Sequence, residues 1–386
     1  MAALIPLTNT PRDYAWGATD GVARTLGWTP TGGPEAELWL GAHPLSPSRR
    51  AAPAGDAAPT WHDLAEWEQQ SGVALPYLLK LLAAASPLSL QAHPTPAQAA
   101  EGFAREEAAG IPLTARERNY KDPHAKPELI VAVDDGFEAL CGFRPVAETL
   151  ALVDALAAAS DTPEALAPWR DAAAAGVHEG FSWLLSGADE VDAAVAAASL
   201  TAQRHPRRFE LIDRLSRQYP GDAGILVAQM LNHVTLAAGE ALWLPAGNIH
   251  AYLRGTGVEL MGPSDNVLRG GLTPKHVDRD ELQKVLDFTP GPASRLEPVP
   301  VSPHVVSYRP ASVPSGAGVG FELLLVTGDA TVRTGSAAIA LAIDGSFTLS
   351  VDGVDAAAPR GAVVFVDEPA EVRAAGSGRL FVATGV

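Results

Sequence analysis

The chain has a single cysteine, Cys141, among its 386 residues. An intrachain disulfide is therefore impossible, and a zinc site built from several cysteine thiolates is excluded. No uninterrupted run of about 18 apolar residues occurs, so no membrane span is expected. The start of the sequence lacks a basic region followed by an apolar run, so no signal peptide is expected either. Together these absences predict a cytoplasmic protein.

Positive charge is also scarce. Lysine and arginine number 28 against 45 aspartates and glutamates, which gives a formal net charge of −17. An acidic protein repels phosphate at long range, so nucleic acid and anionic membranes are not expected as partners. An anionic substrate would need a locally positive pocket. With 47% hydrophobic residues, a chain of this length can bury a core and is long enough for two or three domains.

The segment from Leu231 to Asp278 carries the most informative pattern. Its short apolar runs VTL, ALWL, AYL and VELM are separated by glycine and proline turns, which is typical of a meander of strands. His250 follows a Pro-Ala-Gly-Asn turn at the expected start of a strand, where its side chain could point into a small barrel. Several polar residues then crowd into a glycine-rich stretch, namely Glu259, Asp265, Asn266, Arg269, Thr273 and Lys275. A surface loop would have the same composition, so both interpretations stay open here.

Two earlier predicted strands carry isolated polar side chains. In SPLSLQAHP, Ser89, Gln91 and His93 alternate with apolar residues and therefore share one strand face. Glu128 opens the apolar run ELIVAV directly after a Lys-Pro pair. A carboxylate at the mouth of an apolar strand is costly unless a lysine or a metal compensates its charge. A solvent-exposed strand face would explain the first of these segments equally well.

Helix-forming segments interrupt the strands. The run from Tyr77 to Ala85 (YLLKLLAAA) predicts a helix, and residues 145–219 are alanine-rich with helical spacing and no convergent polar residues. A proline-rich linker at 287–304 precedes short strands with glycine turns from 305 to 386. The sequence therefore predicts a mostly-β fold with two jelly-roll-type β modules. One is a discontinuous domain of residues 1–144 and 220–286, interrupted by an α-helical insertion domain at 145–219, and the other is the C-terminal module at 305–386.

A weak internal repeat supports two β modules. When residues 239–250 (GEALWLPAGNIH) are aligned without gaps with residues 361–372 (GAVVFVDEPAEV), Trp243 falls on Phe365 and His250 on Val372. The second copy would thus lack the residue that could bind a metal.

Four of these side chains form a candidate metal site: Gln91, His93, Glu128 and His250. Histidine together with a carboxylate is ordinary zinc chemistry, and three or four such ligands leave room for water or substrate. An amide oxygen is a rarer zinc ligand. Spacing alone does not prove that the four converge, and each residue considered separately is more often structural than ligating.

The motifs as a set resemble those of type I phosphomannose isomerases, which are zinc enzymes of the cupin fold. The resemblance rests on YAWG, AELWLGAHP, PLSLQAHP, DPHAKPEL, LPAGNIHAYL and VELMGPSDNVLRGGLTPKHVD, which occur between Trp16 and Asp278 in the family's order. It implies a catalytic cupin barrel, a second metal-free barrel and interconversion of D-mannose 6-phosphate and D-fructose 6-phosphate. It further implies one Zn²⁺ per chain, bound by Gln91, His93, Glu128 and His250, with Arg269 catalytic, Ser89 and Lys275 contacting the substrate phosphate, and Lys126 and Glu259 lining the same pocket.

The implied reaction is consistent with these residue types. Aldose–ketose isomerisation moves a proton between C1 and C2 through an enediol(ate), so negative charge develops on O1 and O2, where zinc and a guanidinium can stabilise it. Because arginine stays cationic, Arg269 is expected to act electrostatically, and Glu259 is the first candidate base, with a zinc-bound water as the second. Lys275 and Lys126 would supply positive charge for the phosphate. Zinc binding by neutral imidazoles predicts that activity falls below about pH 6.

One position departs from the family pattern. The family usually has histidine directly before the lysine of KPE, whereas this chain has Ala125 there and His124 one place earlier. Any proton-transfer role of that histidine would be vacant or displaced. Two other function classes stay open, a cupin that only binds sugar and a redox cupin, which usually holds iron with three histidines or with two histidines and a carboxylate. A monomer is expected, although the sequence does not exclude an oligomer.

Overall fold

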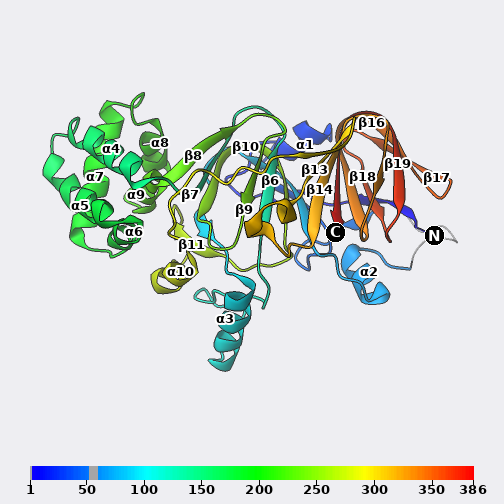
Figure 1. The fold of residues 1–386 in the computed structure, drawn as a ribbon, viewed down its shortest axis with the longest axis horizontal. Coiled ribbons are helices and arrows are strands. Elements are labelled where there is room, and N and C mark those ends of the chain that lie inside the picture. The colour runs from blue at the N-terminus through cyan, green and yellow to red at the C-terminus, as the bar shows by residue number, and fades with distance from the viewer. Residues whose placement is uncertain (1, 52–59) are drawn as a thin grey trace.

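The computed structural model describes residues 2–51 and 60–386. Two antiparallel sheets lie side by side, with a block of helices at the far end of the first sheet and both chain ends near the second (Figure 1). The observed architecture is therefore mostly sheet, as predicted. None of the helices within the described ranges is long and apolar enough to cross a membrane.

The first sheet is organised around one long strand. Its nine strands are β2 (Glu37–Leu40), β4 (Leu78–Ala84), β5 (Leu90–Ala92), β6 (Glu128–Ala132), β7 (Phe137–Phe143), β8 (Leu231–Leu236), β9 (Ala241–Leu244), β10 (His250–Met261) and β11 (Leu268–Gly271). Strand β10 pairs with β5 and β7 near its start and with β4 and β6 along its second half. The predicted strand meander is confirmed, except that AYL and VELM belong to this one strand.

Strand β10 bends where it passes from one set of partners to the other. Its pairing with β7 shifts register between Tyr252 and Arg254, and Gly255 follows with φ of +115°. A Cβ atom at Gly255 would lie 2.8 Å from the Cα of Phe137, so a side chain does not fit there. Glycine is required by both the backbone angle and the close approach of β7. The bend lets the sheet curl, which brings its strand ends toward a common interior.

The predicted helix from Tyr77 to Ala85 is wrong, because Leu78–Ala84 form strand β4. All seven residues of this strand are buried, and it pairs with β2 on one side and β10 on the other. Pairing on both edges outweighs the helix propensity of leucine and alanine, since strand preference depends mainly on packing context. The correction matters for the site because the register sets Lys80 directly opposite Glu259.

The second sheet contains ten strands, two of them from the N-terminal segment. They are β1 (Leu4–Thr8), β3 (Arg49–Arg50), β12 (Val299–Ser302), β13 (Val305–Tyr308), β14 (Phe321–Val326), β15 (Ala330–Arg333), β16 (Ala338–Val351), β17 (Val354–Pro359), β18 (Val363–Val366) and β19 (Glu371–Gly385). The expected domain division assigns the second β module to residues 305–386 alone. Strand β1 pairs along β18, however, so the N-terminal segment also contributes to the second sheet. This pairing covers an edge of β18 that would otherwise expose unpaired backbone groups. Strand β12 lies inside the expected linker.

The weak internal repeat corresponds to matching strands. Strands β9 and β18 occupy equivalent positions of the aligned segments, and Trp243 and Phe365 are both buried. Strand β10 begins at His250, while β19 begins at Glu371, one residue before the equivalent Val372. The two sheets therefore repeat the same local pattern, and an apolar residue stands in the second where the first has histidine.

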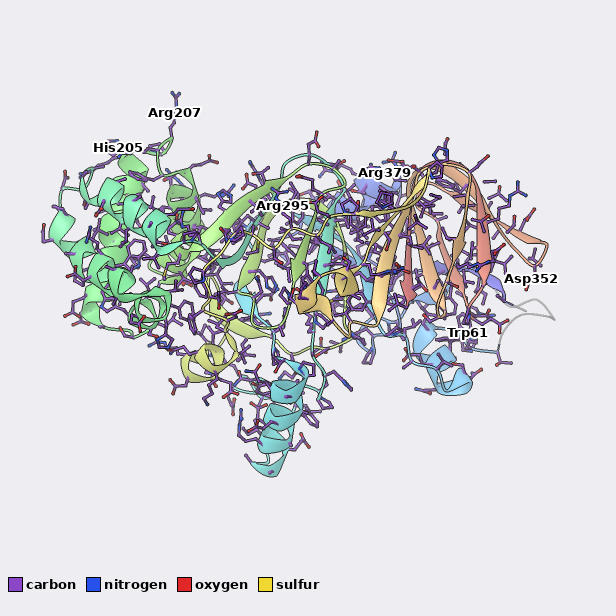
Figure 2. The ribbon with its side chains drawn as sticks, in the orientation of Figure 1. Trp61, His205, Arg207, Arg295, Asp352 and Arg379 are labelled. Atoms are coloured by element: carbon purple, nitrogen blue, oxygen red, sulfur yellow. The ribbon has the colours of Figure 1, made fainter. Side chains whose placement is uncertain are left out.

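The two sheets share a hydrophobic core and are also joined by polar contacts. Leu79 and Trp243 of the first sheet pack in the same cluster as Leu341 and Phe381 of the second. The Tyr77 hydroxyl, next to β4, lies 3.1 Å and 3.0 Å from the carbonyl oxygens of Ala337 and Ala383. Arg379 of β19, labelled in Figure 2, donates to the carbonyl of Val133 at the end of β6. The sheets thus form one packed unit.

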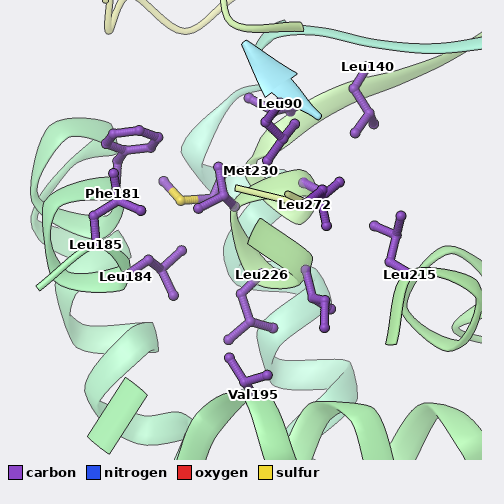
Figure 3. Packing of buried hydrophobic residues seen from close by; sticks show 14 of the residues in the cluster. Leu90, Leu140, Phe181, Leu184, Leu185, Val195, Leu215, Leu226, Met230 and Leu272 are labelled. Carbon is purple, nitrogen blue, oxygen red and sulfur yellow. The ribbon is translucent and has the colours of Figure 1, made fainter. Parts of the chain in front are cut away.

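The helical block interrupts the first sheet between β7 and β8. It consists of α4 (Val146–Ala157), α5 (Ala167–Ala175), α6 (Val177–Leu184), α7 (Asp189–Arg204), α8 (Glu210–Gln218) and α9 (Gly224–Val227). Its apolar faces share a cluster with Leu90 and Leu140 of the sheet and with Leu272, which directly follows β11 (Figure 3). Because side chains alternate along a strand, Leu90 of β5 packs toward the helices while Gln91 faces the other way. The helical block therefore helps to fix β5.

Four further helices flank the sheets: α1 (Gly21–Leu26), α2 (Leu64–Ser71), α3 (Pro96–Ala108) and α10 (Arg279–Val285). Helix α3 begins three residues after His93. Thr95 and Gln98 cap each other's backbone amides in a capping box, and Pro96 occupies the first turn. These signals end the extended segment and start the helix at a defined residue, which fixes the chain that follows His93.

Candidate metal centre and adjoining cavity

Backbone pairing around Gln91 brings together side chains from three strands. Gln91 of β5 pairs with His250 of β10 on one side and with Arg269 of β11 on the other. Directly opposite residues on neighbouring strands have Cβ atoms about 4.5–5.5 Å apart. Residues separated by up to 178 positions in the chain therefore occupy adjacent positions on the sheet.

Glu128 lies between two histidines. Its Oε1 is 3.3 Å from Nε2 of His93, and its Oε2 is 3.1 Å from Nε2 of His250. All three side chains are buried, with exposures of 1%. The ligand atoms of these three residues lie within 4.8 Å of one another. Two atoms that each bind a tetrahedral zinc ion at about 2.0–2.1 Å are roughly 3.3 Å apart, so the spacing suits such an ion.

Hydrogen bonds fix which nitrogen of each imidazole is free. His93 Nδ1 is 2.7 Å from the Asn266 carbonyl oxygen, and His250 Nδ1 is 3.0 Å from that of Asn248. A carbonyl can only accept, so each Nδ1 carries the proton and each Nε2 keeps a lone pair. Both lone pairs then face carboxylate oxygens of Glu128. Acceptors at this distance repel one another unless a cation lies between them.

A metal ion is the cation that fits these residues. Burial is the main cause that lowers the pKa of His93, and the charges of Lys126 and His250 act in the same direction. The pKa falls to about 4 despite the opposing charge of Glu128. Protonation of His93 is therefore disfavoured near neutral pH. His93 Nε2 and Glu128 Oε2 are buried without a hydrogen-bond partner in the described chain, which is costly unless a metal occupies the space between them. Two histidines and a carboxylate are typical zinc ligands.

Gln91 can complete the ligand set. Its side-chain amide nitrogen lies 3.3 Å from His250 Nε2. The nitrogen and oxygen of an amide are exchanged by a rotation of the terminal torsion, and this rotation would turn the oxygen toward the same point. Gln91 therefore stands where a fourth ligand is needed, although an amide is an uncommon one.

Lys126 neutralises part of the charge at this centre. Its Nζ lies 2.9 Å from Glu128 Oε1, and both side chains are buried. Burial alone would raise the pKa of Glu128, but Lys126 and the two histidines hold it well below its ordinary value. Glu128 is thus ionised and ready to bind a cation. Of the two partners that the sequence suggests for Glu128, the structure shows the lysine, and His93 and His250 complete a group that could hold the metal.

The titration of His93 predicts how the metal-free protein responds to acid. Its pKa is about 4 in the fold and 6.5 in the unfolded chain, so only the unfolded chain gains this proton as the pH falls between these values. The free energy of unfolding is therefore unaffected by protonation of His93 above pH 6.5. It falls between pH 6.5 and pH 4, by roughly 3 kcal/mol in total, because only the unfolded chain takes up the proton. Urea unfolding of metal-free protein at several pH values measures the loss. His93→Gln should flatten this dependence, and an unchanged slope in that variant would contradict the assignment.

A cavity of about 490 Å³ opens beside Gln91. Several predicted substrate-site residues line it together, namely Ser89, Gln91, Arg269 and Lys275. Sequence reasoning gave no site role to other lining residues, including Tyr14, Glu37 and Tyr219. Gln91 belongs both to this cavity and to the candidate ligand set, so the cavity adjoins the candidate metal centre.

Arg269 gives the cavity a cation without a carboxylate partner in the described chain. Its Nε is buried and has no hydrogen-bond partner there, and burial lowers its pKa. Burial, with the nearby Arg269 charge, also lowers the pKa of Lys275. Close by, Leu272 has φ of +54°, a strained conformation for a bulky residue and one found mostly at functional sites. The cavity is thus prepared for an anion in an otherwise acidic protein.

Two residues predicted to line this pocket, Lys126 and Glu259, do not line the cavity. Lys126 lies beside Glu128 at the candidate metal centre, whereas Glu259 is held by other side chains. Glu259 is 3% exposed. The Tyr252 hydroxyl donates to its Oε1 at 2.8 Å, and Lys80 Nζ lies 3.3 Å from its Oε2. Burial raises the pKa of Glu259, against the opposing charge of Lys80. Both oxygens are therefore engaged, and this geometry disfavours Glu259 as a base that contacts substrate.

Lys80 is a buried charge that sequence reasoning overlooked. Its Nζ is 3.7 Å from Glu37 Oε1 as well as close to Glu259. The carboxylates of Glu37, Glu259 and Glu128 together raise its pKa against the effect of burial. Glu37 in turn lines the cavity and accepts from Trp39 Nε1 at 2.6 Å. A single lysine inside the apolar run LLKLLAA was the available signal, and it was hidden by the incorrect helix prediction.

The position that departs from the family pattern lies away from this cavity. Neither Ala125 nor His124 lines it. Both instead border a separate cleft together with Pro127 and Trp243. His124 is exposed, so it does not replace a histidine at position 125 within the candidate site.

Comparison with known proteins agrees with the motifs. Residues 4–146 match the family model for the catalytic domain of type I phosphomannose isomerase. The mannose-6-phosphate isomerase of Escherichia coli is 38% identical over 356 residues, which cover 89% of each chain. The human mannose-6-phosphate isomerase is 31% identical over an alignment of 416 positions, which covers 95% of this chain and 94% of the human one.

The chain belongs to the type I phosphomannose isomerase family. Solved members of that family have the same fold. The apo form of mannose 6-phosphate isomerase from Salmonella typhimurium is 32% identical, with a TM-score of 0.84 over 100% of both chains. A zinc-bound mannose 6-phosphate isomerase structure is 33% identical, with a TM-score of 0.84 over 99% of both chains. The fold likeness extends over both sheets and the helical block.

Proposed function

We propose that this member of the phosphomannose isomerase family is a zinc-dependent aldose–ketose isomerase that interconverts D-mannose 6-phosphate and D-fructose 6-phosphate. The observation that carries the proposal is the position of Gln91, which joins the candidate metal centre to a cavity containing Arg269 and Lys275. A Lewis acid next to unpaired cations suits a reaction in which a phosphorylated sugar develops negative charge.

We further propose that each sheet forms a cupin-type jelly roll. The first comprises most of residues 1–144 and 220–286, except for β1 and β3, which pair in the second sheet. The helical block, from α4 to α9 (residues 146–227), acts as an insertion that packs on β5 and extends past the expected boundary at residue 219. The second barrel holds no metal at the position of Val372, because a valine side chain offers no ligand atom.

The metal centre would hold one Zn²⁺ per chain through Gln91, His93, Glu128 and His250. Such an ion supplies Lewis-acid polarisation of the sugar's O1 and O2 when bound. Asn266 and Asn248 support this role by keeping Nε2 of each histidine unprotonated. Lys126 holds Glu128 ionised and offsets its charge.

Arg269 would stabilise the enediolate. Its guanidinium lines the cavity beside Gln91 and has no competing carboxylate in the described chain, so it can donate to the oxygen on which charge develops. Because it cannot lose its proton near neutral pH, it stabilises charge and does not abstract a proton. Lys126 remains a catalytic candidate through its position at the centre. Lys80 and Tyr252 engage both carboxylate oxygens of Glu259, which argues against a direct role for Glu259.

The substrate phosphate would bind between Ser89 and Lys275, and this assignment gives a direct prediction. Lys275→Ala should raise KM roughly 10- to 100-fold with little change in kcat, because a hydrogen bond to a charged group contributes about 1.5–3 kcal/mol to binding in both ground and transition states. Steady-state kinetics with mannose 6-phosphate measure the two parameters. Lys284→Ala, an exposed lysine of α10, is the matched control and should change neither. An equal loss of kcat in Lys275→Ala would contradict a purely binding role.

The reaction itself is tested by a coupled assay that detects fructose 6-phosphate formed from mannose 6-phosphate by the zinc-replete protein. Turnover supports the proposal. The alternative is a cupin that only binds sugar. It predicts saturable binding of mannose 6-phosphate without conversion, and in that case Arg269→Ala would weaken binding but would have no turnover to abolish.

A further inference from the structure

A second cavity, of about 310 Å³, lies between the helical block and strand β8 at the edge of the first sheet. Four arginines line it, Arg144, Arg207, Arg208 and Arg214, against a single lining carboxylate, Glu210. The chain has only 28 cationic side chains and a net charge of −17, so this concentration of positive charge is unusual for it. No residue lines both this cavity and the one beside Gln91.

Three of these arginines have no ion-pair partner within the described residues. The Arg208 guanidinium lies 5.1 Å from the ring centre of Phe209, and Arg207 extends outward from the helical block (Figure 2). Arg144 donates to the Gln229 carbonyl, and its Nε has no partner in the described chain. Burial lowers the pKa of Arg144 against the opposing charge of Glu148. These cations therefore lack the carboxylates that would normally compensate them.

The fourth arginine is held in place. Arg214 is 2.6 Å from Glu138 Oε2, and Glu138 also contacts Arg254 and His233. Because Glu138 is shared among these cations, the wall formed by Arg214 and His233 is fixed but not negative overall. The cavity thus has one wall in which Glu138 engages Arg214 and His233, and two exposed lining arginines, Arg207 and Arg208.

Helix α8 adds backbone donors to the same cavity. Its N-cap residue, Phe209, makes no side-chain cap, and Phe209, Glu210 and Leu211 all line the cavity. The first amides of a helix have no partner within the helix and attract anions. Glu210 and Asp213 lie in the first turn and offset part of this attraction, so the arginines supply most of the field.

We propose that this cavity binds the phosphate group of a small phosphorylated molecule, separately from the substrate cavity. Planar guanidinium groups match phosphate oxygens in pairs, and unpaired backbone amides add donors. The cavity volume is at the lower end of the range for small-molecule sites. The net charge of −17 disfavours a nucleic acid as the ligand.

Calorimetric titration of the zinc-loaded protein tests the proposal with two probes, inorganic phosphate and ribose 5-phosphate. The parent protein carries Lys275→Ala, which weakens binding in the other cavity. In that background Arg207→Ala/Arg208→Ala should weaken binding of the probes about tenfold, or by about 1.4 kcal/mol. The control, Arg204→Ala/Arg333→Ala, removes two exposed arginines that do not line the cavity and should leave the affinity unchanged. Arg208→Lys, which keeps the charge, should lose less than Arg208→Ala.

The two probes distinguish the sources of the phosphate. Tighter binding of ribose 5-phosphate than of inorganic phosphate identifies a site for organic phosphates. Equal binding of the two probes identifies a site for the free anion. Both outcomes support the proposal. It is overturned if neither probe binds the parent at millimolar concentration, or if the two double variants lose affinity equally. Because no turnover is measured, these outcomes do not depend on the isomerase reaction.

Discussion

Replacing Glu128 by glutamine is expected to lower both zinc affinity and isomerase activity by more than about 100-fold. Glu128 Oε1 and Oε2 face the free nitrogens of His93 and His250 at 3.3 Å and 3.1 Å, so this one residue contacts the other two. The change removes the negative charge that holds the cation and also leaves Lys126 without its carboxylate partner. Loss of residues that merely orient metal ligands costs 10- to 100-fold, and loss of a ligand should exceed that. Zinc affinity is measured by competition with a chromogenic chelator.

A matched variant separates this effect from general destabilisation. Glu322→Gln removes a buried carboxylate of the second sheet that is 7% exposed and lies 2.7 Å from Arg309. It should reduce the free energy of unfolding without changing zinc affinity. Equal zinc affinities for Glu128→Gln and Glu322→Gln would show that the metal binds elsewhere.

Arg269→Ala is expected to lower kcat about 10²- to 10³-fold while zinc affinity stays unchanged. Removal of one preorganised hydrogen-bond donor to a developing oxyanion lowers kcat by about this factor in other enzymes. Arg269 is next to Gln91 in the strand register and has no carboxylate partner in the described chain, so its charge is available to the reaction. Stopped-flow or steady-state kinetics on zinc-loaded protein measure the change, and Arg269→Lys should recover only part of the rate because it lacks the paired donors.

The control for this variant is Arg254→Ala. Arg254 is on strand β10 with a side chain that is 55% exposed and pairs with Glu138. Its replacement should leave kcat within about twofold, since exposed ion pairs contribute little. If Arg269→Ala retained the parent kcat and changed only KM, Arg269 would be a binding residue and the electrostatic role would be wrong.

Much of the candidate site could be predicted because its residues stand at strand ends that the sequence marks clearly. The turn before His250 and the Lys-Pro pair before Glu128 punctuate apolar runs, and alternation puts Gln91 and His93 on one face. Convergence could not be predicted from spacing, since it depends on the curl of β10 and on pairing across distant segments. The resemblance to a known family supplied that information.

The remaining differences arise where tertiary pairing outweighs local preference. Leu78–Ala84 has the composition of a helix but is a central strand, so Lys80 and its contact with Glu259 were not anticipated. Strand β1 joins the C-terminal sheet because an edge of β18 is open to it, which no local pattern in residues 4–8 indicates. Glu259 was expected in the pocket but is engaged by Lys80 and Tyr252.

The most direct test of the account is a zinc titration of chelator-treated protein, followed by both bound metal and isomerase activity. The account predicts that metal-free protein is inactive and that activity rises in proportion to bound zinc up to one ion per chain, with the rise abolished in His93→Ala. Full activity in metal-free protein, or unchanged zinc binding in His93→Ala, would contradict it.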